Sequence, residues 1–472
     1  MRKSPILSYV AIIIGIGFTI MQMVSCANIV PPSGGPRDSL PPYLVAAKPN
    51  DSSLHIEPKE IVIAFNEFIV TQSLQENLII SPSIKTTPLI DAKLNMLRIR
   101  INDTLQKNTT YSLRFGDAIK DVNEGNIIKD FTYVFSTGDY IDSGNLKGNV
   151  HIAETGEVDS TLIVVLHPIN QDSAIYKNKP VYYTKVNGQG KFEFKFLPNQ
   201  LFNVYVVPND YTKKYDDSTK AFAFLNAPIA VHHKTDTQNL YVFAAHKKVE
   251  KIKSSSTATN KNAKKPTTYL KYAKSLEANE QDLLSSLKLN FETPIQFNDS
   301  FPILLCDTFY KPVVGVTISL DTTTKRTITI NYKWVESSHF KLIIPKNAFK
   351  DTSNNTLVKN DTVPFVTKSE ASYGTALIRI NGYAAYKNPI LLLTQENKVK
   401  FSYPIQQAIL RAPLLPPGDY KLKILADENN NGYWDNGKYG QIKQQPEIVT
   451  QLPTILAIKA NRDNELTLSL NK

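Results

Sequence analysis

Residues 427–435 carry polar side chains at every second position of the stretch. The alternate residues are Asp427, Asn429, Asn431, Tyr433 and Asp435. Calcium takes about six to eight oxygen ligands, which carboxylates, amides and a backbone carbonyl can supply at this spacing. A glycine at the sixth position permits the sharp bend of such a loop, and Gly432 stands there. The stretch is therefore a candidate calcium loop, and calcium is the one cofactor that the sequence suggests.

Another reading of this stretch needs no metal. The twelfth position, where a bidentate glutamate closes an EF-hand loop, is Lys438. An asparagine-rich hairpin turn explains the same residues, because asparagine and glycine accept positive φ. The corresponding stretch of the first half of the chain, 210–217, carries two lysines, so we expect no metal there. Both interpretations of residues 427–435 stay open at this point.

Residues that could act in catalysis form no clear constellation. Glu67 and Glu292 recur at equivalent places and could work as a glycosidase pair, but polar residues on the exposed face of a strand explain them as well. Cys306 lies in an apolar run and is expected to be a small buried residue. His232 and His233 are adjacent, so on a strand they would face opposite sides, which favours a surface pair over a metal site. We predict that the protein is not an enzyme.

The start of the chain has the features of a secretory signal. Basic residues, the apolar stretch 6–23 and a small residue precede Cys26 in that order. An uncleaved membrane anchor is the alternative, since the apolar stretch is near the lower length limit for a membrane span. The end of the segment resembles the lipobox of bacterial lipoproteins, although Met23 stands where leucine is commonest. We expect residues 1–25 to be removed and the mature protein to begin at Cys26.

The lipobox resemblance implies an acylated Cys26, carrying diacylglycerol and palmitate, that ties the protein to a lipid bilayer. Each buried CH₂ group contributes about 0.8 kcal/mol, and two or more chains anchor stably. Ala27 follows the cysteine where an aspartate would favour the inner membrane in some bacteria. The expected location is thus the outer membrane, with a periplasmic or a surface-facing orientation equally open.

The positive charge of the chain is concentrated in one segment. The formal net charge is +11, and residues 247–265 hold seven lysines against one glutamate. No aromatic residues are interleaved with these lysines to stack on bases, so the segment predicts a solvated linker and no nucleic-acid partner. Residues 26–42 are rich in proline, glycine and serine and read as a disordered tether.

Two halves of the chain repeat the same alternating strand patterns. Residues 61–69 and 287–295 alternate apolar and polar side chains as half-buried strands do. Residues 118–126 and 348–355 both carry an aspartate followed by an asparagine-containing turn. The patterns predict an all-β chain of tandem β-sandwich domains in two repeated pairs, preceded by the signal segment.

The first member of each pair resembles the bacterial Ig-like domain of the S-layer-protein type. The opening strand of the form Ile-x-Phe-x-Glu-x-Ile, the turn after Asp121 and the closing residues 135–138 carry this resemblance. It assigns residues 43–139 to a first Ig-like domain and 269–368 to a degenerate second one, in which Asn354 and Asn355 replace the glycine turn.

The second member of each pair resembles a prealbumin-like or carboxypeptidase-regulatory-like β-sandwich. Residues 415–420 read Leu-Pro-Pro-Gly-Asp-Tyr before an alternating strand, and 197–202 stand at the equivalent place. Asn187 and Gly188 between two alternating runs predict a β-hairpin. These domains are expected at 140–246 and 369–472, with the linker at 247–268 between the pairs.

The whole arrangement is similar to Ig-like-domain lipoproteins of Bacteroidota. That resemblance implies a membrane-anchored, non-catalytic scaffold or adhesion module of the cell envelope, with an envelope protein or polysaccharide as partner. A glycan-binding or accessory subunit of a carbohydrate-active enzyme, or a partner subunit of an outer-membrane transport or export complex, is the alternative. Aromatic residues that could stack on sugars, or else fill the core, are Tyr383, Tyr386, Tyr433 and Trp434.

Overall fold

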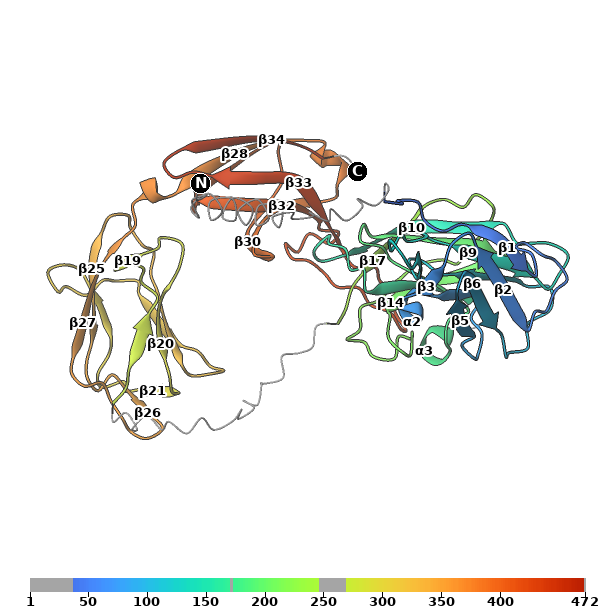
Figure 1. Ribbon diagram of the computed structural model, residues 1–472. Helices are drawn as coiled ribbons and strands as arrows, with labels where there is room; N and C mark the ends of the chain where they lie inside the picture. The colour runs from blue at the N-terminus through green and yellow to red at the C-terminus, as the bar shows by residue number, and fades with distance from the viewer. Residues whose placement is uncertain (1–36, 170–172, 246–268, 471–472) are drawn as a thin grey trace, which may run out of the picture. The chain divides into compact units, whose positions relative to one another are not determined.

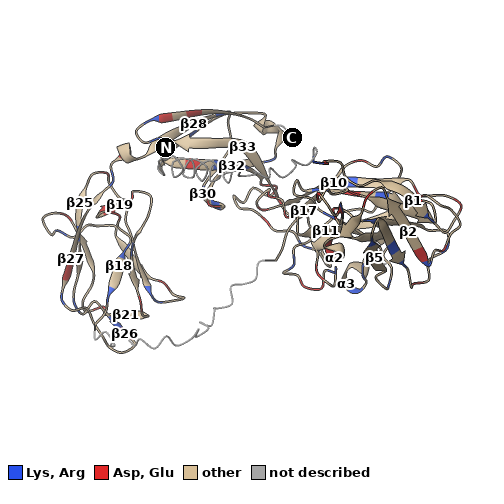
Figure 2. Ribbon diagram, in the orientation of Figure 1, with Lys and Arg blue, Asp and Glu red and all other residues tan. Residues whose placement is uncertain are grey.

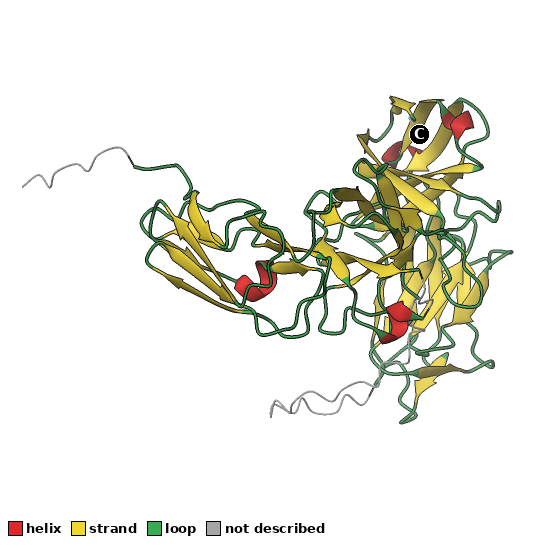
Figure 3. Ribbon diagram, turned by 90° about the vertical axis from the view of Figure 1, so that its right-hand side faces the viewer, coloured by secondary structure: helices red, strands yellow, loops and turns green. Residues whose placement is uncertain are grey.

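The computed structural model describes residues 37–169, 173–245 and 269–470. Nearly all of its regular structure is strand (Figure 3). The exceptions are single turns of helix: α2 (Leu74–Asn77), α3 (Ala174–Lys177), η1 (Glu370–Ser372) and η2 (Tyr383–Ala385). The predicted all-β fold class is therefore confirmed. The signal segment, Cys26 and the linker 247–268 lie outside the described residues. Within the described ranges, no helix has the length and apolar character needed to cross a bilayer.

The chain divides into two units, Met1–Ser143 and Gly144–Lys472. The strands of the first unit are β1 (Leu44–Lys48), β2 (Glu60–Phe65), β3 (Ile69–Thr71), β4 (Ile79–Ser81), β5 (Leu89–Lys93), β6 (Met96–Arg100), β7 (Thr110–Arg114), β8 (Ile119–Asp121) and β9 (Thr132–Ser136) (Figure 1). They form one sheet in the order β1-β2-β6-β5, a second in the order β4-β7-β9, and the pair β3-β8.

The alternation of residues 61–65 explains how these strands pack. Ile61, Ile63 and Phe65 point to one face of β2 and are almost completely buried. Leu97 and Ile99 do the same on the neighbouring β6. Burying a large apolar side chain contributes about 1.5–3 kcal/mol, so the shared face forms the core between the two sheets. Apolar side chains at every second position of a strand thus lie together on the buried face of the sheet.

Residues 144–242 of the second unit form a sandwich of a different topology. Its strands are β10 (Gly144–Ile152), β11 (Leu162–Pro168), β12 (Tyr182–Lys185), β13 (Lys191–Leu197), β14 (Leu201–Pro208), β15 (Ala223–Phe224), β16 (Ile229–Ala230) and β17 (Gln238–Val242). One sheet has the order β13-β10-β17, in which β10 and β17 are parallel. The other has the order β12-β11-β14-β15, with β16 also paired to β14.

The hairpin predicted at Asn187 and Gly188 is wrong. The turn itself exists, because Asn187 Oδ1 accepts the N–H groups of Gln189 and Lys191, both at 2.9 Å. However, β12 pairs with β11 in one sheet and β13 with β10 in the other. Tyr182 and Phe192 belong to the same buried core, so the turn carries the chain from one layer to the other.

Residues 272–367 repeat the strand pairing of the first unit. The strands are β18 (Tyr272–Lys274), β19 (Glu280–Gln281), β20 (Leu287–Phe291), β21 (Ile295–Phe297), β22 (Leu304–Cys306), β23 (Thr317–Leu320), β24 (Thr327–Asn331), β25 (His339–Ile344), β26 (Phe349–Asp351) and β27 (Asp361–Thr367). The sheets are β18-β20-β24-β23, β19-β27-β25-β22 and the pair β21-β26.

Residues 374–469 repeat the pairing of residues 144–242. The strands are β28 (Gly374–Asn381), β29 (Pro389–Gln395), β30 (Lys398–Pro404), β31 (Ile409–Leu415), β32 (Gly418–Ala426), β33 (Ile448–Ile458) and β34 (Asp463–Ser469), in sheets β31-β28-β34 and β30-β29-β32-β33. Gly144 faces Leu197 and Gly374 faces Leu415, each beside a β-bulge. The tandem β-sandwich arrangement in two repeated pairs is thus confirmed at the level of strand register.

Charged side chains do not gather on one sheet of the described residues. Figure 2 shows Lys and Arg scattered among Asp and Glu along the strands and loops. The ion pairs are surface pairs between exposed or half-exposed side chains, such as Arg100 with Glu60 at 3.3 Å. Pairs of this kind contribute about 0–1 kcal/mol each, so the fold depends on its apolar cores.

Candidate functional sites

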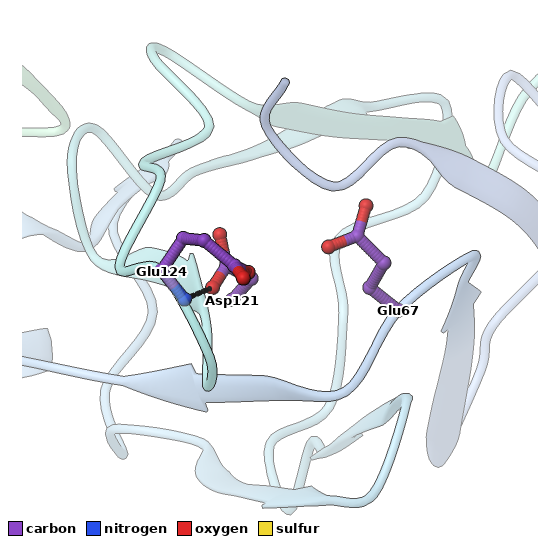
Figure 4. Close-up of side chains that lie close together, drawn as sticks. All are labelled: Glu67, Asp121 and Glu124. Atoms are coloured by element: carbon purple, nitrogen blue, oxygen red, sulfur yellow. Dashed lines mark hydrogen bonds between the residues drawn. The ribbon is translucent and has the colours of Figure 1, made fainter. Parts of the chain in front are cut away.

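Glu67, Asp121 and Glu124 form a carboxylate cluster in the first unit, which we call the acidic cluster. Among the described residues this is the group that brings three carboxylate oxygens within 4.8 Å of one another. Asp121 is the last residue of β8, Glu124 lies on the turn that follows, and Glu67 lies on the loop between β2 and β3 (Figure 4). Such oxygens are the ligands that hard cations prefer.

The buried member of the acidic cluster already has hydrogen-bond donors. Asp121 is 1% exposed, and its carboxylate accepts the N–H groups of Glu124, Gly125 and Asn126 at 2.6, 2.8 and 2.7 Å. Burial raises the pKa of Asp121, but these backbone donors together outweigh burial and hold the pKa below its ordinary value. The chief work of this carboxylate is to close the turn.

The second copy keeps this turn and lacks the rest of the cluster. Asp351 accepts the N–H groups of Ser353 and Asn355, both at 2.8 Å. Asn354 takes the left-handed conformation with φ of 60°, as Gly125 does with φ of 80°. Because asparagine tolerates this conformation, the turn survives without its glycine. Ser353 occupies the position that corresponds to Glu124, so the turn of the second copy does not supply this carboxylate.

Glu67 and Glu292 do not lie on strand faces as the sequence suggested. Strands β2 and β20 end at Phe65 and Phe291, so both glutamates lie in the loops that follow. Glu67 is half-buried and accepts a hydrogen bond from Asn66 Nδ2 at 2.7 Å, whereas Glu292 is exposed. They belong to separate domains of the repeat.

The candidate calcium loop connects β32 to β33. Asp427 is 1% exposed and accepts the N–H groups of Asn431 and Gly432 at 3.2 and 2.8 Å. Asp435 Oδ2 accepts the side-chain amides of Asn429 and Asn431 at 2.5 and 2.6 Å. Asp427 and Asp435 thus each accept hydrogen bonds from residues that lie between them in the loop. Whether they bind calcium stays a prediction.

Sequence spacing missed a further carboxylate at this loop. Glu447 is 6% exposed and accepts the N–H groups of Glu428 and Asp435 at 2.8 and 3.0 Å. Burial raises the pKa of Glu447 above its ordinary value, and the nearby carboxylates of Asp427 and Asp435 raise it further. Glu447 lies beyond any metal-loop spacing from Asp427, so only the pairing of β32 with β33 reveals it.

The cysteine and histidine predictions fit the structure. Cys306 is fully buried on β22, and burial raises the pKa of its thiol. A protonated buried thiol is a poor nucleophile. His232 and His233 are exposed, as expected of a surface pair. By contrast, burial lowers the pKa of His167 to about 4, so that imidazole is neutral at physiological pH.

The four aromatic residues singled out in the sequence divide into two groups. Tyr383 and Tyr386 are half-buried and pack against the core of residues 376–470. Trp434 packs on the outer face of the β29-β32 sheet and donates from Nε1 to Glu447 O at 2.7 Å. Tyr433 is 77% exposed. Three of the four therefore contribute to packing, which leaves Tyr433 as the one open to a ligand.

An exposed aromatic turn that sequence reasoning missed lies between β22 and β23. In residues 307–314, here called the aromatic tip, Phe309 is 88%, Tyr310 56% and Val314 91% exposed. Asp307 Oδ1 accepts the N–H groups of Phe309 and Lys311, both at 2.9 Å, which orders the turn. The sequence indicates this turn by two adjacent aromatic residues, Phe309 and Tyr310, at a place where polar residues are usual.

A lysine from a neighbouring strand supports the aromatic tip. Lys341 Nζ on β25 donates to Thr308 O at 3.1 Å and lies 3.7 Å from the centre of the Tyr310 ring. A cation over a tyrosine face contributes about 0.5–1 kcal/mol at exposed sites. The tip is thus a preorganised apolar projection, and contiguous exposed apolar groups mark interaction sites.

One family model matches a segment of the first unit. Residues 38–137 match the family model of the bacterial Ig-like domain, which confirms the resemblance drawn for the first copy. No curated protein matches the chain.

Solved structures match the chain with low sequence identity and low TM-scores. The major pilin subunit BcpA of Bacillus cereus is 10% identical, with 70% of this chain and 99% of that chain covered and a TM-score of 0.18. The TIE protein of Bacillus anthracis is 11% identical, with 93% and 76% covered and a TM-score of 0.17. The N-terminal part of the S-layer protein SbsC is 13% identical, with 37% and 42% covered and a TM-score of 0.16. With TM-scores this low, these likenesses support no statement about function.

Proposed function

We propose that this protein is a non-catalytic lipoprotein of the outer membrane that holds β-sandwich domains beside the bilayer and binds an envelope protein. The observation that carries the proposal is the aromatic tip, where Phe309 and Val314 are almost fully exposed on an ordered turn. Exposed aromatic and aliphatic groups lose contact with water when a partner covers them, which favours association. The matched family model, a bacterial Ig-like domain, names no catalytic activity.

The lipid anchor is the first part of the proposal to test. The Cys26→Ser variant removes the thiol that would carry the acyl groups. We expect the wild-type protein to incorporate labelled palmitate and to sediment with membranes. The variant should do neither. Palmitate incorporation that persists in the variant would place the modification elsewhere and contradict the assignment of Cys26.

The binding role of the aromatic tip calls for a matched comparison. A double variant, Phe309→Ser with Val314→Ser, removes most of the exposed apolar surface of the tip. Tyr211→Ser is the control, because Tyr211 is 86% exposed on another domain. Tagged proteins would be recovered from detergent-solubilised membranes after chemical cross-linking.

We expect the cross-linked partner to fall at least about tenfold in the double variant, as for loss of an interface hot spot, and to be unchanged in the control. Equal recovery from both variants would refute the role of the tip. A partner that survives protease digestion would instead be a polysaccharide, which would favour the glycan-binding alternative and overturn the choice of a protein partner.

Calcium binding at residues 427–435 is the second part of the proposal. Three carboxylates of this loop, from Asp427, Asp435 and Glu447, all belong to buried or half-buried residues whose charge a cation would neutralise. Burial and then the nearby carboxylates raise the pKa of Glu447, and a divalent ion would offset both effects by pairing with its charge. Calcium would then order the connection between β32 and β33.

A further inference from the structure

The sheet β12-β11-β14-β15 buries apolar side chains on both of its faces. On β11, Leu162, Val164 and Leu166 point into the sandwich core, whereas Ile163 and Val165 point to the opposite side. All five side chains are at most 2% exposed. A sheet of a free-standing sandwich usually turns one face to water, so a second buried face needs a cover.

The second face is an aromatic surface, here called the aromatic face. It gathers Tyr205, Tyr215, Phe222, Phe224 and Phe243 around Ile163. The rings of Tyr215 and Phe222 stack at 3.9 Å, and Tyr205 and Phe222 stack at 5.8 Å. Burying a ring of this kind contributes more than burying a small aliphatic group, because each aromatic side chain removes a large area from water.

A residue from the C-terminal sandwich packs onto the aromatic face. Tyr439, in the connection between β32 and β33, has its ring 4.8 Å from the rings of both Phe222 and Phe224. Its hydroxyl group lies 3.1 Å from that of Tyr205, within hydrogen-bond distance. Gly437 lies so close to Phe243 that an added Cβ would come within 2.6 Å of the ring. The connection therefore fits the aromatic face closely.

Hydrogen bonds fix this connection at both ends. Asn436 Nδ2 donates to Ala244 O at 2.7 Å. Gln445 Nε2 donates to Phe224 O and to Asn226 Oδ1, both at 2.9 Å. These bonds flank Tyr439 in the sequence and join residues more than 190 positions apart. Their partners include backbone carbonyls, which gives the contact a defined register.

A second contact joins the same two sandwiches. Lys423 on β32 is 4% exposed and donates from Nζ to Thr155 O at 2.8 Å. The N–H group of Val449 on β33 donates to Ala153 O at 2.8 Å. Gly156, with φ of 70°, lies against Val449 O, and a Cβ there would come within 2.7 Å of that oxygen. A buried ammonium group is costly unless hydrogen-bonded, so this contact is specific.

We propose that residues 436–445 and the aromatic face form an intramolecular clasp, which holds the sandwich of residues 144–245 to that of residues 369–470 independently of the chain between them. The clasp closes a loop that contains the linker 247–268 and the second Ig-like domain. The entropy cost of closing a long loop grows only slowly with its length, so an aromatic contact of this size is sufficient to hold it. The occupant of the aromatic face is this chain's own loop.

The test uses the mature chain with Cys26 replaced by serine and a protease site inserted between Ser255 and Ser256. After cleavage the linker no longer joins the two fragments. We expect them to coelute as a one-to-one complex at about 1 μM, because a well-packed aromatic contact supports binding at this level. Tyr439→Ala should weaken the complex at least about tenfold. Tyr211→Ala is the control, since Tyr211 is 86% exposed on the sandwich of residues 144–245, and it should leave the affinity unchanged.

Three outcomes would overturn the clasp. The cleaved fragments could separate at about 1 μM, which would show that the contact does not hold without the linker. The control could weaken binding as much as Tyr439→Ala does. The uncut chain could form dimers in sedimentation experiments, which would place the loop on a second copy. Should Tyr439→Ala fail to fold, Gln445→Ala removes two hydrogen bonds with little apolar loss, and it should weaken the complex at least about fivefold.

Discussion

The turn closed by Asp121 offers the sharpest test of how the first unit is stabilised. Replacing Asp121 with asparagine keeps the size of the side chain and removes its charge. The carboxylate now accepts two N–H groups at Oδ1 and one at Oδ2. In the Asp121→Asn variant the amide oxygen can keep two of these bonds, as neutral bonds, while the NH₂ group faces the third donor and cannot accept from it.

The expected loss of stability follows from these three bonds. Hydrogen bonds to charged groups contribute about 1.5–3 kcal/mol and neutral ones about 0.5–1.5 kcal/mol, and an unsatisfied donor costs about 1–3 kcal/mol. Asp121 is 1% exposed, so water does not readily replace the lost acceptor. Two weakened bonds and one unsatisfied donor sum to at least about 3 kcal/mol, which corresponds to at least about 150-fold in an opening equilibrium.

Native-state hydrogen exchange read by mass spectrometry localises this loss, because a protein of several domains does not unfold in one transition. We expect exchange to rise at least about 150-fold in peptides that cover residues 119–128, with no change in the second unit. Asp117→Asn is the matched control, since Asp117 is exposed and the charge change is the same. If both variants exchange alike, the carboxylate does not hold the turn and the reasoning fails.

Three further predictions follow from the same kinds of evidence. Because the native pKa of Asp121 is lowered, its contribution to stability is complete above the ordinary aspartate pKa of 3.8 and is lost as the pH falls below that value. Below pH 3.8, protection of the turn from exchange should therefore decline in the wild type and stay level in Asp121→Asn. Calcium at about 100 times its dissociation constant should stabilise the wild type by about 2.7 kcal/mol in calorimetry, and Asp427→Ala should abolish this stabilisation. A wild-type melting temperature that does not change with calcium would refute the calcium site. Gly148→Ala should lower the free energy of unfolding by about 1–3 kcal/mol, since its Cβ would lie 2.1 Å from Gln238 O across the parallel β10-β17 pair. Gly188→Ala is the control, because a Cβ there has nothing within 4 Å, and it should leave thermal unfolding unchanged.

The strands and their repetition were readable from the sequence for a physical reason. A half-buried strand shows a period of two within a few residues, so the buried alternation of Ile61, Ile63 and Phe65 is a local signal. The same holds for Leu287, Leu289 and Phe291 in the second copy. Repetition of the whole pattern then predicts repetition of the domain, which the strand pairing confirms.

The candidate sites were readable only in part. The candidate calcium loop was visible because its ligating positions lie within nine residues of one another. Glu447 was not, because it enters the loop through strand pairing. The aromatic turn of Phe309 and Tyr310 could have been noticed from its composition, but its exposure could not, since burial depends on what the rest of the fold places over it.

The sequence by itself determined the strand periodicity, the two kinds of domain and the burial of Cys306, because each depends on the pattern of nearby residues. Only the tertiary structure decided that the Asn187 turn crosses between layers, that Glu67 meets Asp121, and that Tyr439 covers the aromatic face. A signal for the cover did exist, since the run 162–166 is apolar without alternation, which indicates burial on both faces. Which residue supplies the cover depends on contacts between segments more than 200 positions apart, and no local pattern carries that information.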